Sequence, residues 1–456
     1  MMISRIRRGV MASICILILC GTATFGAYES GTSLPGTTPF PLRDTLSRRS
    51  MVPIRNRVVL NEFPEWEGAR LGGAAQNARP SHGQTSKQSP ERRDINPSSF
   101  DDLVARARAA MAAEKLSEAI RLYGMAVRQR PSWSEGWWFL GTLNFDTGHY
   151  TEASDAFTHF VNVEKKQPGP GFGMLGLSEL NLKNYQPALA ALEQGIQLGL
   201  GTDPAFIHSV LYSDGILNNL AGQHEIALQR LTLVANKIAA ANPQDPEQVV
   251  LGDADLLDAF GLAALRIAKL PSDVSAAQAP LVREAGHAEA LIALQDRATA
   301  GDELKELVAL YPSEPGVHYM YGVYLLKENP PLALGEFHRE LQISPTNAVA
   351  RIRLALEYLR LGEYDQGLEE ARKAIALVPG NFIAHIAYGR LLLMAGKPED
   401  AIKELRTAVK LAPGSPDAHL ALSQALSRAG RATEAAHERA TFDRLKAIRD
   451  SSIQKR

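Results

Sequence analysis

Apolar residues in the C-terminal part of the chain recur every three or four positions, which is the spacing of one helical face. The clearest segment, Phe382–Met394, predicts a helix that Gly396 breaks. A second amphipathic segment follows and ends at Pro413, which predicts a second helix of similar length. Each predicted helix has one apolar stripe that it cannot bury by itself, so neighbouring helices must stack.

The same pattern returns along the chain at an interval of 34 residues. Three sets of residues keep this interval: Pro345, Pro379 and Pro413; Gly362, Gly396 and Gly430; and Gly367, Ala401 and Ala435. Proline and small residues at fixed positions of such a period are typical of a stacked helical repeat. The interval therefore predicts an all-α fold, and such a fold argues against most enzyme classes.

The repeat resembles the tetratricopeptide repeat, which has an aromatic residue at position 4, Leu-Gly at 7 and 8, alanine at 20, an aromatic residue at 24 and proline at 32. The unit that begins at Ser134 supplies the best match: Trp137, Leu140, Gly141, Gly148, Tyr150, Ala153 and Phe157. It departs from the pattern at Asn144, Phe160 and Lys165. The resemblance covers residues 99–447 and implies a right-handed superhelical solenoid of about nine to ten helix pairs.

Composition and periodicity divide the chain into six parts. We expect a signal peptide at 1–23, a disordered linker rich in Pro, Gly and Ser at 24–98, an N-terminal repeat stack at 99–253, degenerate repeats with an insertion at 254–312, a C-terminal stack at 313–447 and a tail at 448–456. Within the degenerate part, residues 270–280 read as a loop, and helical stretches follow near 281–297 and 302–310.

The first residues read as an export signal. Three arginines precede an apolar core at 10–19, and Ala23 offers a cleavage position. The core is shorter than the roughly 20 apolar residues of a spanning helix, although an uncleaved inner-membrane anchor at 9–23 is the alternative. We therefore expect an exported chain, periplasmic or extracellular, with membrane contact only if this segment is uncleaved. Cleavage would also remove Cys15 and Cys20, the only cysteines.

One apolar island interrupts the predicted linker. It consists of Val58, Val59, Leu60, Phe63 and Trp66. The island is either an incidental patch or a cap on the first repeat, or else a docking peptide for a partner or for this protein's own groove.

Charge and motifs exclude several classes of function. The formal net charge is −1 with both signs interspersed, which does not fit a nucleic-acid partner. Gly171, Gly173 and Gly176 match the dinucleotide-binding pattern by letters, but they lie where two helices are expected to approach closely.

Three histidines, His318, His385 and His419, share one position in separate repeats, so we expect them to pack rather than to bind metal. With no motif of a nucleophile, a metal or a phosphate-binding loop, we expect no catalytic residue, no metal and no cofactor, and the chain is not expected to be an enzyme.

The resemblance also implies where a partner would bind, since positions 2, 5, 9, 12 and 13 of each first helix line the concave face of such arrays. Carried onto this sequence, these positions give an aromatic set, Trp138, Phe145, Tyr212 and Tyr319, and a basic set, Arg266, Lys327, Arg360, Arg390 and Arg428. The alternative for the aromatic set is packing against neighbouring repeats, and for the basic set it is ordinary solvation. Position 5 holds no lysine, so the clamp that some members use for acidic peptide C-termini is absent.

Taken together, these features favour a non-catalytic scaffold or adaptor that binds a peptide or protein partner in its concave groove. One alternative is a periplasmic component of envelope assembly or polysaccharide export. A second is an enzyme with an unrecognised site in residues 254–312.

Overall fold

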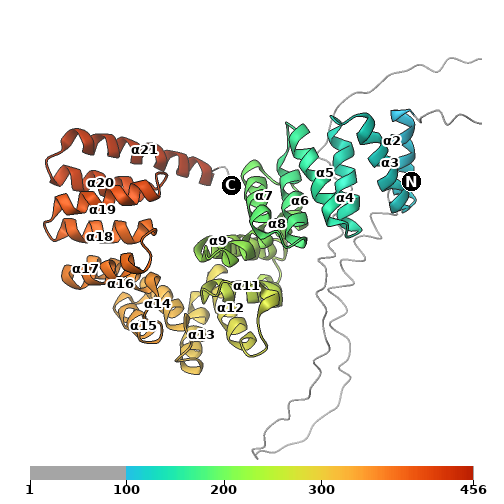
Figure 1. Cartoon of the computed structure of the whole chain (residues 1–456). Helices are drawn as coiled ribbons and strands as arrows, with labels where there is room; N and C mark the ends of the chain where they lie inside the picture. The colour runs from blue at the N-terminus through green and yellow to red at the C-terminus, as the bar shows by residue number, and fades with distance from the viewer. Residues whose placement is uncertain (1–98, 455–456) are drawn as a thin grey trace, which may run out of the picture. The chain divides into compact units, whose positions relative to one another are not determined.

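The computed structural model describes residues 99–454, and the regular structure of that part is entirely helical (Figure 1). The predicted signal peptide, linker and apolar island lie outside the described residues. Within them, nine antiparallel pairs form. The pairs are α2 (Phe100–Ala112) with α3 (Leu116–Gln129), α4 (Ser134–Asp146) with α5 (Tyr150–Val163), α6 (Gly169–Asn181) with α7 (Tyr185–Leu198), α8 (Pro204–Leu220) with α9 (His224–Ala241), α11 (Ala254–Ala264) with α12 (Ala279–Ala293), α14 (Val317–Glu328) with α15 (Pro330–Ile343), α16 (Ala348–Leu361) with α17 (Tyr364–Leu377), α18 (Phe382–Met394) with α19 (Pro398–Leu411), and α20 (Pro416–Arg428) with α21 (Ala432–Gln454).

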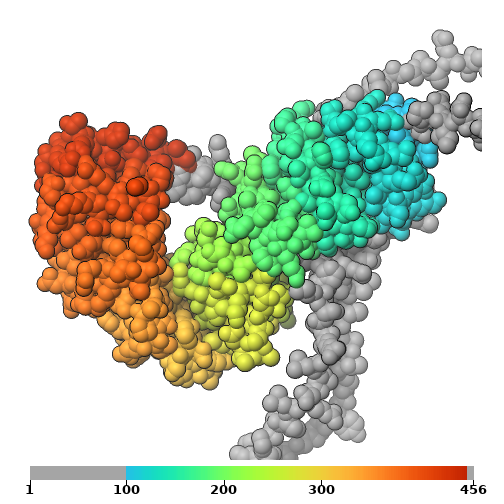
Figure 2. All heavy atoms as spheres, in the orientation of Figure 1, coloured from blue at the N-terminus to red at the C-terminus, as the bar shows by residue number. Residues whose placement is uncertain are grey.

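Two further helices, α10 (Pro246–Leu251) and α13 (Arg297–Leu310), lie between pairs, and a short 3-10 helix, η1 (Pro271–Asp273), lies in the segment that joins α11 to α12. The all-α solenoid of about nine to ten pairs is therefore confirmed. From α14 to α21 the atoms of successive pairs form one continuous block (Figure 2).

Each pair closes around a small residue of its first helix. In five pairs a glycine of the first helix faces a large, fully buried side chain of the second: Gly141 faces Phe157, Gly176 faces Leu192, Gly215 faces Leu231, Gly322 faces Phe337 and Gly389 faces Leu405. A Cβ atom on Gly389 would lie 2.5 Å from Leu405 Cγ. The side chain of the second helix therefore rests on the backbone of the first, which fixes the depth at which the pair packs.

The turn inside a pair also has a repeated form. A residue one or two positions after the first helix has a positive φ, and it is Gly148, Gly222, Gly362, Gly396 or Gly430 in five of the turns. The following backbone N–H then donates to a carbonyl five residues earlier, as His149 does to Asn144 at 2.9 Å. This is the Schellman arrangement, and glycine adopts its left-handed residue without steric cost.

In α11 the same turn falls on Arg266, whose φ is +60°, and Ile267 donates to Leu262 at 2.8 Å. The predicted place of Arg266 on the face of a first helix is wrong, because α11 ends at Ala264 and the turn arrives two residues early. Because no glycine marks this turn, the earlier end of the helix could not be predicted from the residues around it.

The segment between α11 and α12 is tied to the preceding pair by side chains. Asn219, at the end of α8, donates from its amide to the carbonyls of Ile267 and Lys269 at 2.9 and 3.1 Å. The amide oxygen of Asn219 lies 2.8 Å from Nδ1 of His224, and Arg266 pairs with Glu225 at 2.7 Å. We call this set of contacts the seam.

Helices α11 and α12 cross at backbone distance. A Cβ atom on Gly261 would lie 1.8 Å from the carbonyl oxygen of Val282, and one on Gly286 would lie 1.9 Å from that of Leu257. Only glycine permits this approach, because the neighbouring atoms belong to the backbone and cannot rotate away.

Substituting Gly261→Ala should therefore lower the free energy of unfolding by at least about 3 kcal/mol, because two helices must separate. Gly335→Ala is the matched control, since nothing lies within 4 Å of a Cβ atom on that residue in α15. The control should be neutral or stabilising by up to about 1 kcal/mol through its better helix propensity. Chemical denaturation followed by circular dichroism compares them, and equal stability of the two variants would contradict this account of the crossing.

The seam should weaken in acid because of His224, whose ring is buried and whose pKa is lowered to about 4 by burial and then by the charge of Arg266. Since the unfolded ring has a pKa of about 6.5, the unfolded chain binds the proton more tightly. This contribution to stability is complete above about pH 6.5 and is lost as pH falls toward 4, by up to about 3 kcal/mol.

The variant His224→Gln keeps a hydrogen-bonding side chain without the titration. The difference in unfolding free energy between the wild type and His224→Gln should therefore shrink or reverse between pH 7 and pH 4.5. His437→Gln on the exposed surface of α21 is the control. If the wild type and His224→Gln lose stability in parallel, His224 does not sense acid.

Candidate functional site

The aromatic residues of the predicted groove are largely part of the core. Phe145 is 8% exposed and lies edge-on to Tyr150 at 5.4 Å between ring centroids. Trp138 is half-buried and packs against Phe157 and Phe160 at 5.8 and 5.3 Å. The packing alternative therefore describes this end of the array better than an open aromatic surface does.

The other two predicted aromatic residues lie on either side of the middle of the chain. Tyr212 is half-buried, and burial raises the pKa of its phenol. Tyr319 is 4% exposed and packs on Phe337 at 5.9 Å between ring centroids. The guanidinium of Arg266 lies 5.4 Å from the centroid of Tyr319, so two predicted site residues do meet, although in a structural contact.

The remaining basic residues are exposed on successive first helices of the C-terminal part. Lys327 lies at the end of α14, Arg360 on α16, Arg390 on α18 and Arg428 at the end of α20. Arg360 pairs with Glu357 on its own helix at 2.8 Å. In the described part of the chain, the other three form no ion pair, so their charges are available to a ligand.

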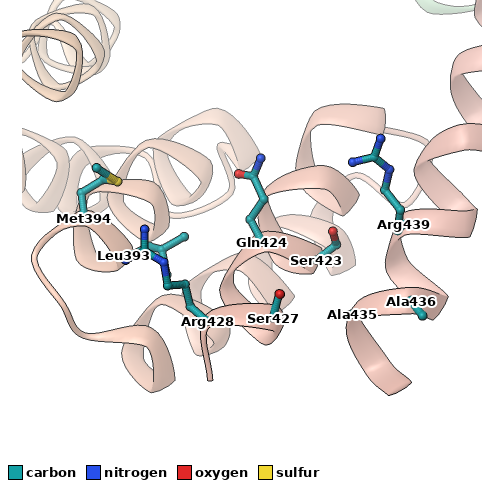
Figure 3. A pocket seen from close by; sticks show the side chains of 9 residues that line it. All are labelled: Leu393, Met394, Ser423, Gln424, Ser427, Arg428, Ala435, Ala436 and Arg439. Carbon is teal, nitrogen blue, oxygen red and sulfur yellow. The ribbon is translucent and has the colours of Figure 1, made fainter. Parts of the chain in front are cut away.

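A hollow of about 630 Å³ lies between α18, α20 and α21 (Figure 3). Its lining comes from three helices: Leu393 and Met394 on α18; Ser423, Gln424, Ser427 and Arg428 on α20; and Ala435, Ala436 and Arg439 on α21. We call it the terminal pocket. Figure 3 shows Gln424 between Arg428 and Arg439.

Arg439 was not predicted from the sequence, because it lies on a second helix and the positions that the resemblance assigns to the concave face belong to first helices. It is exposed and lies 3.4 Å from Asp443, one turn along the same helix. An exposed pair at this spacing contributes little, so Arg439 can exchange Asp443 for another carboxylate.

The three histidines at one repeat position form contacts between repeats. Each ring is buried and lies between a glutamate of its own second helix and the carbonyl of the proline that precedes its repeat. The contacts are His318 with Glu336 and Pro312, His385 with Glu404 and Pro379, and His419 with Glu438 and Pro413, at 2.6 to 3.1 Å. Arg351 makes the same two contacts, with Glu370 at 2.6 Å and Pro345 at 2.7 Å. These histidines therefore pack between repeats, as expected, but through polar contacts. We call the contact of one side chain with both a proline carbonyl and a glutamate the junction clamp.

The glycines of the dinucleotide-like motif lie inside α6 rather than in a turn between a strand and a helix. Cβ atoms on Gly171, Gly173 and Gly176 would lie within 2.8 Å of side chains from α5, α8 and α7, respectively. Three neighbouring helices thus approach the backbone of α6, which accounts for the motif without a nucleotide.

Between residues 99 and 454, no three acidic, histidine or cysteine side chains gather as they would around a metal ion. No helix in this range combines the length and the apolar composition that crossing a bilayer requires.

Comparison with known proteins gives one family. The family model described as "Tetratricopeptide repeat" matches residues 104–159, 352–416 and 395–444. The search of curated proteins gave no match.

Among solved structures, the chain is similar to MamA from Desulfovibrio magneticus RS-1, with 20% identity over 37% of this chain and 97% of that one and a TM-score of 0.35. It is also similar to a second MamA structure, with 17% identity, 36% and 96% coverage and a TM-score of 0.33. The family matches and the repeated helix pairs show that this chain carries tetratricopeptide repeats, with family matches over residues 104–159 and 352–444.

Proposed function

We propose that this protein is a non-catalytic scaffold that binds a protein partner along the first helices of its C-terminal repeats. The observation that carries the proposal is the row of exposed cations on α14, α16, α18 and α20, three of which have no ion-pair partner among the described residues. Exposed charges on consecutive helices steer an oppositely charged partner and fix its orientation. An acidic extended peptide or amphipathic helix has the corresponding chemistry.

The proposed surface differs from the one expected from the sequence. Phe145 and Tyr319 are buried and Arg266 is paired, so these residues are left out of it. Lys327, Arg360, Arg390 and Arg428 remain.

We further propose that the scaffold works outside the cytoplasm. The support is the charged and apolar pattern of residues 1–23, which resembles an export signal. A component of envelope assembly or polysaccharide export is the narrower version of this proposal. Partners recovered from the envelope fraction would distinguish such a component from a general adaptor.

Reversing two of the cations should remove partner capture. The double variant Arg360→Glu and Arg390→Glu replaces attraction by repulsion, and we expect binding of the recovered partner to weaken at least about tenfold and its dependence on salt to flatten. The measurement is a crosslinking pull-down with the full chain, followed by titration of the identified partner at two salt concentrations.

The matched control reverses two exposed cations on second helices, Arg372 on α17 and Lys410 on α19. Those changes alter the net charge equally and should leave capture intact. If the two double variants lose binding to the same extent, the first-helix face is not the binding surface.

A further inference from the structure

The lining of the terminal pocket defines what it can hold. Its charged residues, Arg428 and Arg439, are both basic, and no acidic residue lines it. Ser427 and Gln424 add exposed hydrogen-bonding groups between them. Such a lining suits carboxylates, because guanidinium groups bind them with paired hydrogen bonds.

One side of the pocket is apolar. Met394, which closes α18, is 45% exposed, and Leu393 lies next to it in the lining. A thioether and an aliphatic side chain form adaptable contacts with aromatic rings. The preferred ligand therefore has carboxylates and a large apolar side chain within a few residues of one another.

One segment of this chain has that composition, and it lies outside the residues that the structure describes. Residues 62–67 carry Glu62, Glu65 and Glu67 in alternation with Phe63 and Trp66. They hold three of the seven acidic residues found between positions 24 and 98, and of the other four only Glu29, beside Tyr28, has an aromatic neighbour within two positions. The segment thus combines the two chemical features that the pocket lining selects.

We propose that the terminal pocket binds residues 62–67 of the same chain, with glutamates on Arg428 and Arg439 and an aromatic side chain against Leu393 and Met394. The 27 residues between Leu71 and Ser99 span at most about 95 Å when extended, which sets the limit of their reach. A tethered segment acts at an effective concentration on the order of millimolar, so even modest affinity keeps the pocket occupied. Binding of this segment is independent of the proposed protein partner, and a peptide of the chain itself is enough to test it.

The test uses a labelled peptide of residues 58–71 as the probe. The wild-type full chain should bind the peptide weakly, because its own segment occupies the pocket. A chain with Glu62→Gln, Glu65→Gln and Glu67→Gln has a disabled segment and should bind the peptide at least about tenfold more tightly. Fluorescence anisotropy at low ionic strength measures both affinities.

Adding Arg428→Glu and Arg439→Glu to the triple variant should abolish this binding. Arg444→Glu is the matched control, since Arg444 is an exposed residue of α21 that does not line the pocket, and it should leave binding intact. A second peptide carries lysines in place of its three glutamates. It should bind the chain with Arg428→Glu and Arg439→Glu more tightly than it binds the triple variant that keeps both arginines. Far-ultraviolet circular dichroism checks that each variant is folded.

Three outcomes would overturn the proposal. Equal binding of the peptide by the wild type and the triple variant would mean that the chain's own segment does not occupy the pocket. Binding that survives reversal of both arginines would place the peptide elsewhere. A dimer seen by sedimentation that the triple glutamate change dissolves would mean that the segment docks on a second copy instead.

Discussion

Five of the nine helix pairs depend on one contact, in which a bulky side chain of the second helix rests on the backbone of a glycine in the first. Leu405 on Gly389 and Phe337 on Gly322 are examples, and both bulky residues are fully buried. A larger residue in place of the glycine would push the helices apart, and a smaller one in place of the leucine or phenylalanine would leave a cavity. Because neighbouring pairs stack on one another, a change in the packing depth of one pair would shift the next, so each such contact also constrains the position of the following repeat.

The junctions between pairs are held in a different way. In the junction clamp, one histidine or arginine side chain contacts the carbonyl of the proline before its repeat. The same side chain also contacts a glutamate on the second helix of its own repeat. His385 does this between Pro379 and Glu404, and Arg351 does it between Pro345 and Glu370. Arg351 reaches the same two kinds of acceptor with two guanidinium nitrogens, so arginine and histidine can share this position. A clamp of this kind sets the register between repeats, whereas an apolar contact alone would permit sliding.

Much of this fold follows from the sequence, because its two main signals act locally. The bounds of α18 agree with the prediction, since an apolar stripe begins at Phe382 and a left-handed glycine ends the helix at Gly396. The register failed at Arg266, where the turn is made without glycine. The clamp left a signal that was not used: Glu336, Glu370, Glu404 and Glu438 keep the 34-residue interval. The terminal pocket could not be predicted, because Arg439 belongs to a helix whose facing partner is set by tertiary packing rather than by the repeat.

The charges of the array separate into those that the fold needs and those that it does not. Arg351 and Arg283 each bond a carboxylate on a neighbouring helix, with side-chain exposures of 14% and 43%, and removing the partly buried Arg351 would leave Glu370 with Lys373 as its remaining ion-pair partner. Lys327, Arg390 and Arg428 are exposed and form no ion pair within the described residues, so their substitution should cost little stability. Reversing these cations therefore tests the proposed binding surface with little disturbance of the fold, while changes at the glycines and the junction clamp test the array itself.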